Sequence, residues 1–180
     1  MSKIEVNKII PRTGTTLSLG DSGDTLTLTS GAKTSGFGKI GQLKSTTFST
    51  ATTSSSSTYA DITGASLSIT PSTTSSKIYF TCYLAGCRKS GSNTHMGLKL
   101  FRQINGGGYT EIEKFENGFG YTNSTVTVSS AGSYAYLDSP ATTDQVDYKL
   151  QFNSGANSNG VKVNVDGQEA STVTLQEVLD

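Results

Sequence analysis

The sequence contains no tryptophan, one histidine, two cysteines and three prolines, and it is poor in charge. Asp, Glu, Lys and Arg make up 16% of the residues and balance to a formal net charge of zero. Because the most basic cluster is only Arg88-Lys89, we expect neither nucleic-acid binding nor attraction to an anionic membrane. No apolar run approaches the roughly eighteen residues of a membrane span, and residues 1–10 lack the apolar core of a signal peptide. We expect a protein made in the cytosol without membrane insertion.

The two cysteines, Cys82 and Cys87, lie in a run that reads as one strand. Successive side chains of a strand point to opposite faces, so their odd spacing predicts thiols that face opposite ways and form no mutual disulfide. We interpret both as buried structural thiols. The only histidine, His95, cannot supply a zinc-binding set, and we expect neither a metal nor a cofactor.

One segment resembles a catalytic motif. GDSGD at residues 20–24 contains the GDSG that surrounds the nucleophile of trypsin-like serine proteases. A protease also needs a base and an orienting acid, and no motif supports His95 in that role. The carboxylates elsewhere are scattered, unlike the opposed pair of a glycosidase. We therefore predict no catalytic residue and no enzyme activity.

Serine, threonine, asparagine and twenty glycines take the place of the missing charge. Eight tyrosines and seven phenylalanines lie within short runs of alternating polarity, which are typical of packed strands. Over residues 39–180 the pattern predicts an all-β domain, an antiparallel sandwich or barrel of about nine or ten strands. Residues 125–137 are open to two interpretations, one strand or two strands separated by a turn at SSAGS.

A short tandem repeat occupies residues 14–32. The repeat unit is nine residues long, so that Leu17 corresponds to Leu26 and Leu19 to Leu28. Gly, Ser and Asp follow each pair of leucines. Four leucines bury too little apolar area to offset the entropy of ordering this segment alone, so we predict that they contact other copies of the chain. Glycines at 31, 36, 38 and 41 indicate a boundary between the N-terminal segment and the domain that follows it. Residues 1–38 are predicted to be a β-structured attachment and trimerisation segment.

Residues 77–85 form the most hydrophobic predicted strand. Ile78, Phe80, Cys82 and Leu84 share one face, and the other face carries tyrosines. A strand with two apolar faces packs against its own core on one side and against a neighbour on the other. We therefore predict that Tyr79 and Tyr83 lie in an interface between subunits.

Several segments resemble parts of known virion proteins. SKIEVNKIIPRTGTTLSLGDSGDTLTLTSGA followed by SGFG resembles the N-terminal segment of virion structural and tail-fibre proteins of marine bacteriophages, notably those of cyanobacteria. ADITGASLSITPSTTSSKIYF, YAYLDSPATTDQVDYKLQF and STVTLQEV resemble the head domains of similar fibres. Those heads are in turn similar to trimeric jelly rolls of the C1q/TNF type.

The resemblance implies a homotrimer in the virion, in which the N-terminal segment attaches to other tail or capsid proteins and the jelly-roll head is displayed. A short tail fibre that recognises the host surface is the first interpretation. A capsid decoration or head-fibre protein is the alternative, and a polysaccharide-degrading tailspike is the third.

An antiparallel sandwich alternates its loops between two ends. If the first strand begins at Lys39, the loops far from that residue are 49–58, 86–94 and 117–123. These loops combine aromatic, amide and cationic side chains, a mixture that suits contact with a host glycan or protein. The candidate receptor-facing residues are Arg88, Lys89, Asn93, Phe119, Tyr121 and Asn123.

Overall fold

The computed structural model describes residues 40–155 and 160–179. Within these ranges the chain forms strands and no helix, and hence no helix long enough to cross a membrane. The predicted repeat, with the rest of segment 1–38, lies outside the described residues. The strands are β1 (Ile40–Phe48), β2 (Thr52–Ser54), β3 (Ala60–Ile69), β4 (Lys77–Lys89), β5 (Thr94–Ile104), β6 (Thr110–Thr122), β7 (Val128–Asp138), β8 (Val146–Ser154), β9 (Val161–Val163) and β10 (Ser171–Val178).

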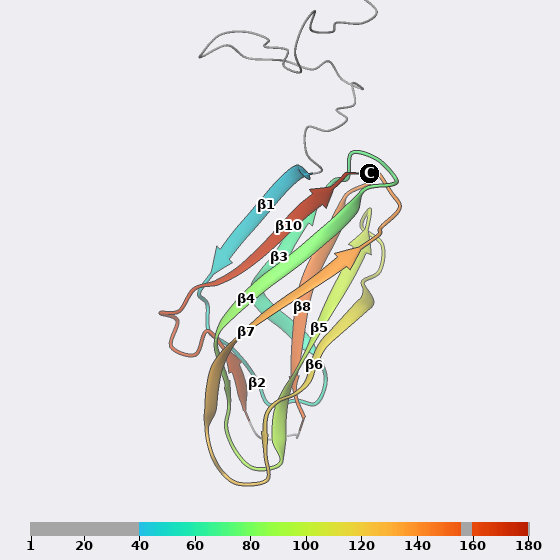
Figure 1. The fold of residues 1–180 in the computed structure, drawn as a ribbon. Coiled ribbons are helices and arrows are strands. Elements are labelled where there is room, and N and C mark those ends of the chain that lie inside the picture. Colours follow the sequence, from blue (N-terminus) through green and yellow to red (C-terminus); the bar gives the residue numbers. More distant parts are fainter. Residues whose placement is uncertain (1–39, 156–159, 180) are drawn as a thin grey trace, which may run out of the picture. The chain divides into compact units, whose positions relative to one another are not determined.

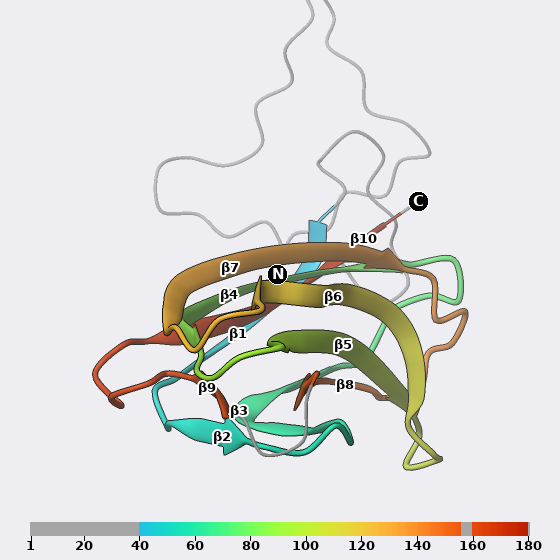
Figure 2. The ribbon, with the colours of Figure 1, turned by 90° about the horizontal axis from the view of Figure 1, so that it is seen from below.

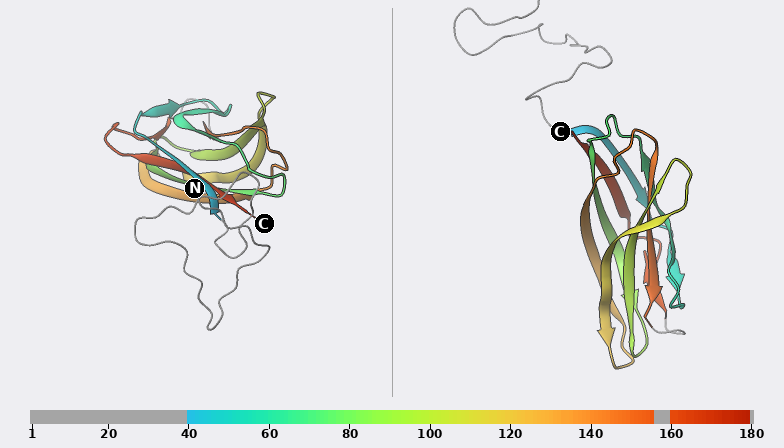
Figure 3. Two further views of the ribbon diagram at one scale, coloured as in Figure 1. Left: turned by 90° about the horizontal axis from the view of Figure 1, so that it is seen from above. Right: turned by 90° about the vertical axis from the view of Figure 1, so that its right-hand side faces the viewer.

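The strands form two antiparallel sheets that face each other as two layers (Figures 2 and 3). In sheet A, β4 lies between β10 and β7, β1 pairs with the outer edge of β10, and the short β9 and β2 extend the far end of β4. Sheet B has the order β3-β8-β5-β6. The pairs are nested, β1 with β10, β3 with β8, β4 with β7 and β5 with β6. This is the pairing of a jelly roll, and the predicted antiparallel β-sandwich is confirmed.

The core fills the space between the sheets. Every second side chain of the central strands points into it, as the alternating sequence predicts. Phe80 and Leu84 of β4, Leu98 of β5, Leu150 of β8 and Leu175 of β10 are all fully buried. Figure 1 shows that the β4–β5 and β6–β7 loops lie at the opposite end of the sandwich from the start of β1 and the end of β10.

A bulge in β4 overturns the predicted placement of the cysteines. The register between β4 and β7 shifts between Leu84 and Cys87, and Gly86 occupies the irregular position with a φ of 53°. Because one irregular residue reverses the alternation, Cys82 and Cys87 both point into the core, and the expectation of opposite faces is wrong. Both thiols are free, and burial raises the pKa of each to about 12.

The segment that the sequence left open is one strand. β7 pairs with β4 from Val128 to Asp138, so of the two interpretations the single strand holds, and SSAGS forms no turn. Serine, alanine and glycine have little strand preference of their own. Their backbone groups nevertheless pair with the long strand β4, and this non-local pairing outweighs local preference.

A buried carboxylate holds together the end of the sandwich at which β1 begins. Glu177 of β10 is fully buried and accepts hydrogen bonds from four neutral groups. Its Oε1 receives the Ser72 backbone N–H at 2.5 Å, the Ser72 hydroxyl at 2.6 Å and the Ser76 hydroxyl at 2.8 Å, and its Oε2 receives Gln42 Nε2 at 2.8 Å. Glu177 thus ties the β3–β4 turn and β1 to β10.

This network predicts an acid-dependent loss of stability. Burial opposes ionisation of Glu177, but the hydrogen bonds from Ser72, Ser76 and Gln42 outweigh it and hold the carboxyl pKa below its usual value. A lowered folded pKa stabilises the fold above the unfolded pKa, and this stabilisation is lost as the pH falls through the folded pKa. Glu177→Gln should therefore destabilise the protein at pH 7 by about 1–3 kcal/mol and flatten the decline of stability below about pH 4.5.

Chemical denaturation at a series of pH values measures this effect. Glu116→Gln is the control, because Glu116 of the edge strand β6 is only half-buried and its Oε1 receives the neighbouring backbone N–H groups of Asn117 and Gly118. If the free energy of unfolding declined equally steeply with acid in Glu177→Gln and in wild type, Glu177 would not be the cause of the acid-dependent loss of stability.

Candidate subunit interface

The side of sheet A turned away from the core presents three rows of residues across β1, β10, β4 and β7. Each residue lies opposite its neighbour in register, so that all side chains of a row share this face. The rows are Leu43–Gln176–Tyr79–Leu137, Ser45–Thr174–Thr81–Ala135 and Thr47–Thr172–Tyr83–Ser133. We call these twelve residues the sheet A face.

The outer rows of the sheet A face expose large apolar side chains. Leu43 is 61% exposed, Leu137 49%, Tyr83 46% and Tyr79 37%. Tyr79 and Leu137 are direct cross-strand neighbours, so these side chains belong to one surface. Soluble monomers rarely expose large contiguous apolar patches, and these exposed side chains make the sheet A face a candidate interface.

The sheet A face also lacks charge, since none of its twelve residues is acidic or basic. The outer side of sheet B has the opposite character. There Lys149 Nζ lies 2.8 Å from Asp61 Oδ1 and Lys99 Nζ lies 2.5 Å from Glu111 Oε2. Charged pairs thus lie on the outer side of sheet B, whereas on the outer side of sheet A the exposed Lys77 of β4 lies beyond the Tyr79 row, outside the sheet A face.

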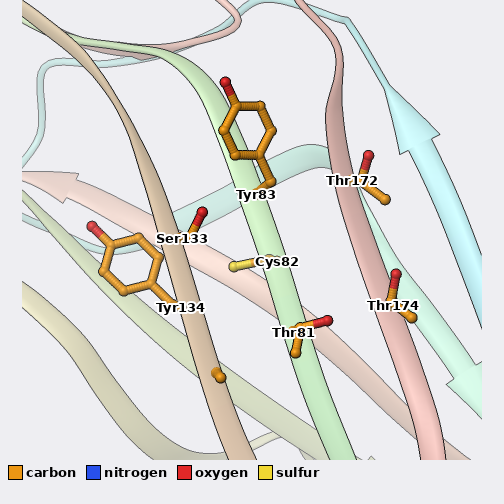
Figure 4. A pocket seen from close by; sticks show the side chains of 8 residues that line it. Thr81, Cys82, Tyr83, Ser133, Tyr134, Thr172 and Thr174 are labelled. Atoms are coloured by element: carbon orange, nitrogen blue, oxygen red, sulfur yellow. The ribbon is translucent and has the colours of Figure 1, made fainter.

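The small residues of the middle row leave a hollow in the sheet A face. It has a volume of about 390 Å³ and is lined by Thr81, Cys82, Tyr83, Ser133, Tyr134, Ala135, Thr172 and Thr174. Figure 4 shows the Tyr83 ring beside this hollow, with Thr172 and Thr174 of β10 on one side and Ser133 of β7 on the other. Its shape and its apolar and hydroxyl lining suit an inserted apolar or aromatic side chain.

Burial keeps two of the side chains that line the hollow neutral. Burial raises the pKa of Tyr134 and of Cys82 to about 12, so neither group carries charge at neutral pH. The Tyr134 ring stacks on Phe115 of β6 with centroids 5.3 Å apart. These side chains support the surface from below and give it no acid–base chemistry.

A second apolar surface lies where sheets A and B meet along their edge strands β6 and β7. Its side chains pack against the core but remain partly exposed, because β6 and β7 are the last strands of their sheets. We call it the β6–β7 edge. It consists of Ile112, Phe115, Phe119, Tyr134 and Tyr136.

Comparisons with known proteins identify no family. No protein-family model and no curated protein matches the chain. A solved structure of infectious bursal disease virus, Gx strain, matches at 12% identity and a TM-score of 0.42, covering 77% of this chain and 37% of that chain. The Gt strain matches at 12% and 0.39, covering 78% and 39%. The chain thus spans well under half of either viral chain, and a likeness at this level supports no function.

Two of the six predicted interface residues lie in the described part of the chain. Tyr79 and Tyr83 both project from the sheet A face, while Ile78, Phe80, Cys82 and Leu84 are buried behind them. The four predicted leucines, Leu17, Leu19, Leu26 and Leu28, lie outside the described residues. Sequence reasoning missed Leu43 and Leu137, which complete the row through Tyr79.

The candidate receptor-facing residues lie on β4, the β4–β5 loop, β6 and the β6–β7 loop, toward the end of the sandwich opposite the start of β1. Asn93, Tyr121 and Asn123 are exposed, whereas Arg88 and Phe119 are half-buried. Lys89 is fully buried. Its ammonium donates to the Gly91 carbonyl at 2.8 Å and to the Thr122 hydroxyl, so it stabilises these loops from within.

His95 lies on the same part of the sandwich. Its ring is half-buried and lies 6.3 Å from the Tyr121 ring, centroid to centroid. Among the described residues, no three His, Cys, Asp or Glu side chains gather where they could hold a metal ion. The GDSGD segment that resembles a protease motif lies outside the described residues.

Proposed function

We propose that this chain is a non-enzymatic structural protein of a bacteriophage particle, a short trimeric tail fibre whose copies associate through the sheet A face. The observation that carries the proposal is the sheet A face, whose twelve residues include no charged side chain and which exposes Leu43, Tyr79, Tyr83 and Leu137. The resemblance of the terminal and strand segments to phage fibre proteins supports its place in a virion.

Two different surfaces favour a ring of subunits over a two-fold dimer. The sheet A face has a hollow, whereas the β6–β7 edge consists of one aliphatic and four aromatic side chains that are partly buried against the core. Packing an edge of one copy onto the face of the next is a heterologous contact, which closes into a ring when the rotation permits. In a closed ring every face and every edge is covered, and the resemblance to trimeric jelly-roll heads supports three copies.

Mutation of the sheet A face in the full chain tests whether the copies associate through this surface. Tyr79→Ala combined with Tyr83→Ala should raise the dissociation constant of the trimer about 100-fold or more, because a buried aromatic anchor contributes about 2 kcal/mol. Sedimentation equilibrium over a range of concentrations measures the constant. The matched control is Tyr109→Ala with Tyr121→Ala, which removes two tyrosines that are 40% and 58% exposed elsewhere.

The outcomes of these experiments distinguish the contribution of the sheet A face to assembly from that of the N-terminal repeat. Wild-type protein that sediments at the mass of one 18.8 kDa chain would refute the proposal. A double variant that keeps the wild-type constant would refute the role of the face. Replacing Leu17, Leu19, Leu26 and Leu28 by serine tests the repeat separately, and we expect an additional weakening.

In this proposal, the end of the sandwich that carries the β4–β5 and β6–β7 loops contacts the host surface, through Asn93, Tyr121 and Asn123. Gold-labelled antibodies against the sandwich would locate the protein on imaged particles. Label on the tail agrees with a fibre. Label spread over the head would favour the capsid decoration protein, whose removal lowers capsid stability without lowering adsorption.

A further inference from the structure

An interruption of β3 opens a second hollow, on the outer side of sheet B. The register between β3 and β8 is broken between Asp61 and Ser66. Gly64, with a φ of 85°, lies within this bulge, where a Cβ would approach Phe48 Cβ to 2.6 Å. The bulge leaves a hollow of about 280 Å³, lined by Asp61, Ile62, Thr63, Gly64, Ser66, Tyr109 and Lys149.

The carboxylate in this hollow is held in place from β8. Lys149 Nζ lies 2.8 Å from Asp61 Oδ1 and 3.0 Å from Oδ2, and Gln151 Nε2 donates to Oδ1 at 2.7 Å. Partial burial opposes ionisation, but the bonds from Lys149 and Gln151 outweigh it and keep the pKa of Asp61 below its usual value. A carboxylate accepts about four hydrogen bonds, so Asp61 keeps acceptor capacity for a ligand.

An aromatic ring forms one wall of the hollow. Tyr109 follows the glycine-rich β5–β6 turn and is 40% exposed. The Lys149 ammonium lies 4.1 Å from the centroid of its ring, a cation–π distance that orients the ring. Lys149 therefore positions both the carboxylate and the aromatic wall.

The charges around the hollow disfavour an anionic ligand. Asp61 and Lys149 neutralise each other. Burial and the nearby Asp147 carboxylate raise the pKa of Tyr109, and this carboxylate adds negative charge. What remains is a hydrogen-bond acceptor, the Thr63 and Ser66 hydroxyls and an aromatic surface. This combination matches a ligand with hydroxyl groups along its rim and C–H groups on its face. The volume lies just below the roughly 300 Å³ at which pockets begin to hold drug-sized ligands, which suits a single ring.

We propose that this hollow binds a neutral saccharide ring, with sugar hydroxyls donating to Asp61 and the apolar face of the ring against Tyr109. The site uses neither the sheet A face nor the predicted receptor-facing loops. It is therefore independent of the proposed trimer and fibre.

Nuclear magnetic resonance titration of the full chain with the methyl glycosides of glucose, galactose, mannose and N-acetylglucosamine tests the site. We expect at least one to bind with a dissociation constant of about 1 mM, near −4 kcal/mol, and to shift the backbone amides of residues 61–66 and 149–151. Tyr109→Ala and Asp61→Ala should each weaken binding at least tenfold. Lys114→Ala, which removes an exposed side chain of β6 outside the hollow, should not.

Several outcomes would overturn the proposal. These are no binding of any of the four glycosides, shifts confined to other residues, or equal affinity of wild type and Tyr109→Ala. Tighter binding of the acidic sugar sialic acid would also overturn it, because the site would then not select a neutral ring. Amide spectra of each variant show whether it is folded. A second variant, Tyr109→Leu, removes the aromatic ring but keeps an apolar side chain at the rim of the hollow.

Discussion

Replacing Asn164 by alanine is expected to lower the free energy of unfolding by about 3 kcal/mol. Asn164 follows β9, is fully buried and has a φ of 53°. Its Nδ2 lies 3.3 Å from the Phe48 carbonyl and 3.4 Å from the Thr50 carbonyl, and its Oδ1 accepts from Ser171 Oγ at 2.6 Å. Alanine would remove the amide donor to the buried Phe48 carbonyl and the acceptor of the buried Ser171 hydroxyl proton, and losing such buried hydrogen bonds costs about 1–3 kcal/mol each when no water replaces them.

The fold provides a matched control for the backbone conformation. Asn93 has nearly the same φ, 51°, but lies exposed in the β4–β5 loop. Asn93→Ala should lower the free energy of unfolding by about 1 kcal/mol, which is the cost of placing alanine in the left-handed conformation. Asn164→Gly removes the amide while tolerating the φ, and should be less destabilising than Asn164→Ala. Denaturant midpoints at one protein concentration measure all three, and equal losses for Asn164→Ala and Asn93→Ala would contradict the role of the buried amide.

Local alternation was sufficient to predict most strands and their buried faces. In β4, Ile78 and Phe80 face the core while Tyr79 faces outward, because side chains of a strand alternate whatever its neighbours are. The same holds for Val173 and Leu175 of β10, which are both fully buried. These features depend only on residues adjacent in sequence.

The bulge in β4 was not predictable in this way, because distant groups hold it. The Ala85 backbone N–H donates to Ser171 Oγ at 2.9 Å, and the Ala85 carbonyl accepts from the Asn164 backbone N–H at 3.0 Å. Nothing near Gly86 in the sequence reveals these partners. The prediction for Cys87 therefore failed although the strand itself was predicted.

The candidate interface was predicted only in part, because some of its residues come together through strands that are distant in sequence. Tyr79 and Tyr83 were identified from their own strand. Leu43 and Leu137 join them only through the register of β1 with β10 and of β4 with β7. One signal was available within YAYL, where Leu137 alternates with Tyr134 and Tyr136, whose rings point inward. The hollow beside Asp61 depends on a bulge and on cross-strand contacts, and no local pattern in the sequence predicts it.

Replacing Asp138 by alanine is expected to cost about 3–5 kcal/mol, because it breaks a network that joins the two sheets. Asp138 ends β7 in sheet A and is 5% exposed. Its oxygens accept Arg102 Nη1 of β5 at 2.8 and 3.0 Å and the Tyr148 hydroxyl of β8 at 2.7 Å. Loss of the carboxylate would leave the hydroxyl of fully buried Tyr148 and a partly buried guanidinium without their acceptor, and removing one member of a buried ion pair has costs of this size.

Tyr148→Phe separates the hydroxyl from the ion pair. The phenylalanine keeps the ring that lies 6.1 Å from Phe80, centroid to centroid, and Asp138 keeps Arg102, so the loss should be about 1 kcal/mol. Once Asp138 is alanine, the hydroxyl has no acceptor to lose, and adding Tyr148→Phe should cost nothing or restore some stability. Denaturation of the two single variants and the double variant should therefore give a coupling of about 1–2 kcal/mol between Asp138 and Tyr148. Additive losses would show that the hydroxyl contributes independently of the carboxylate, and that only the Arg102–Asp138 pair joins the sheets here.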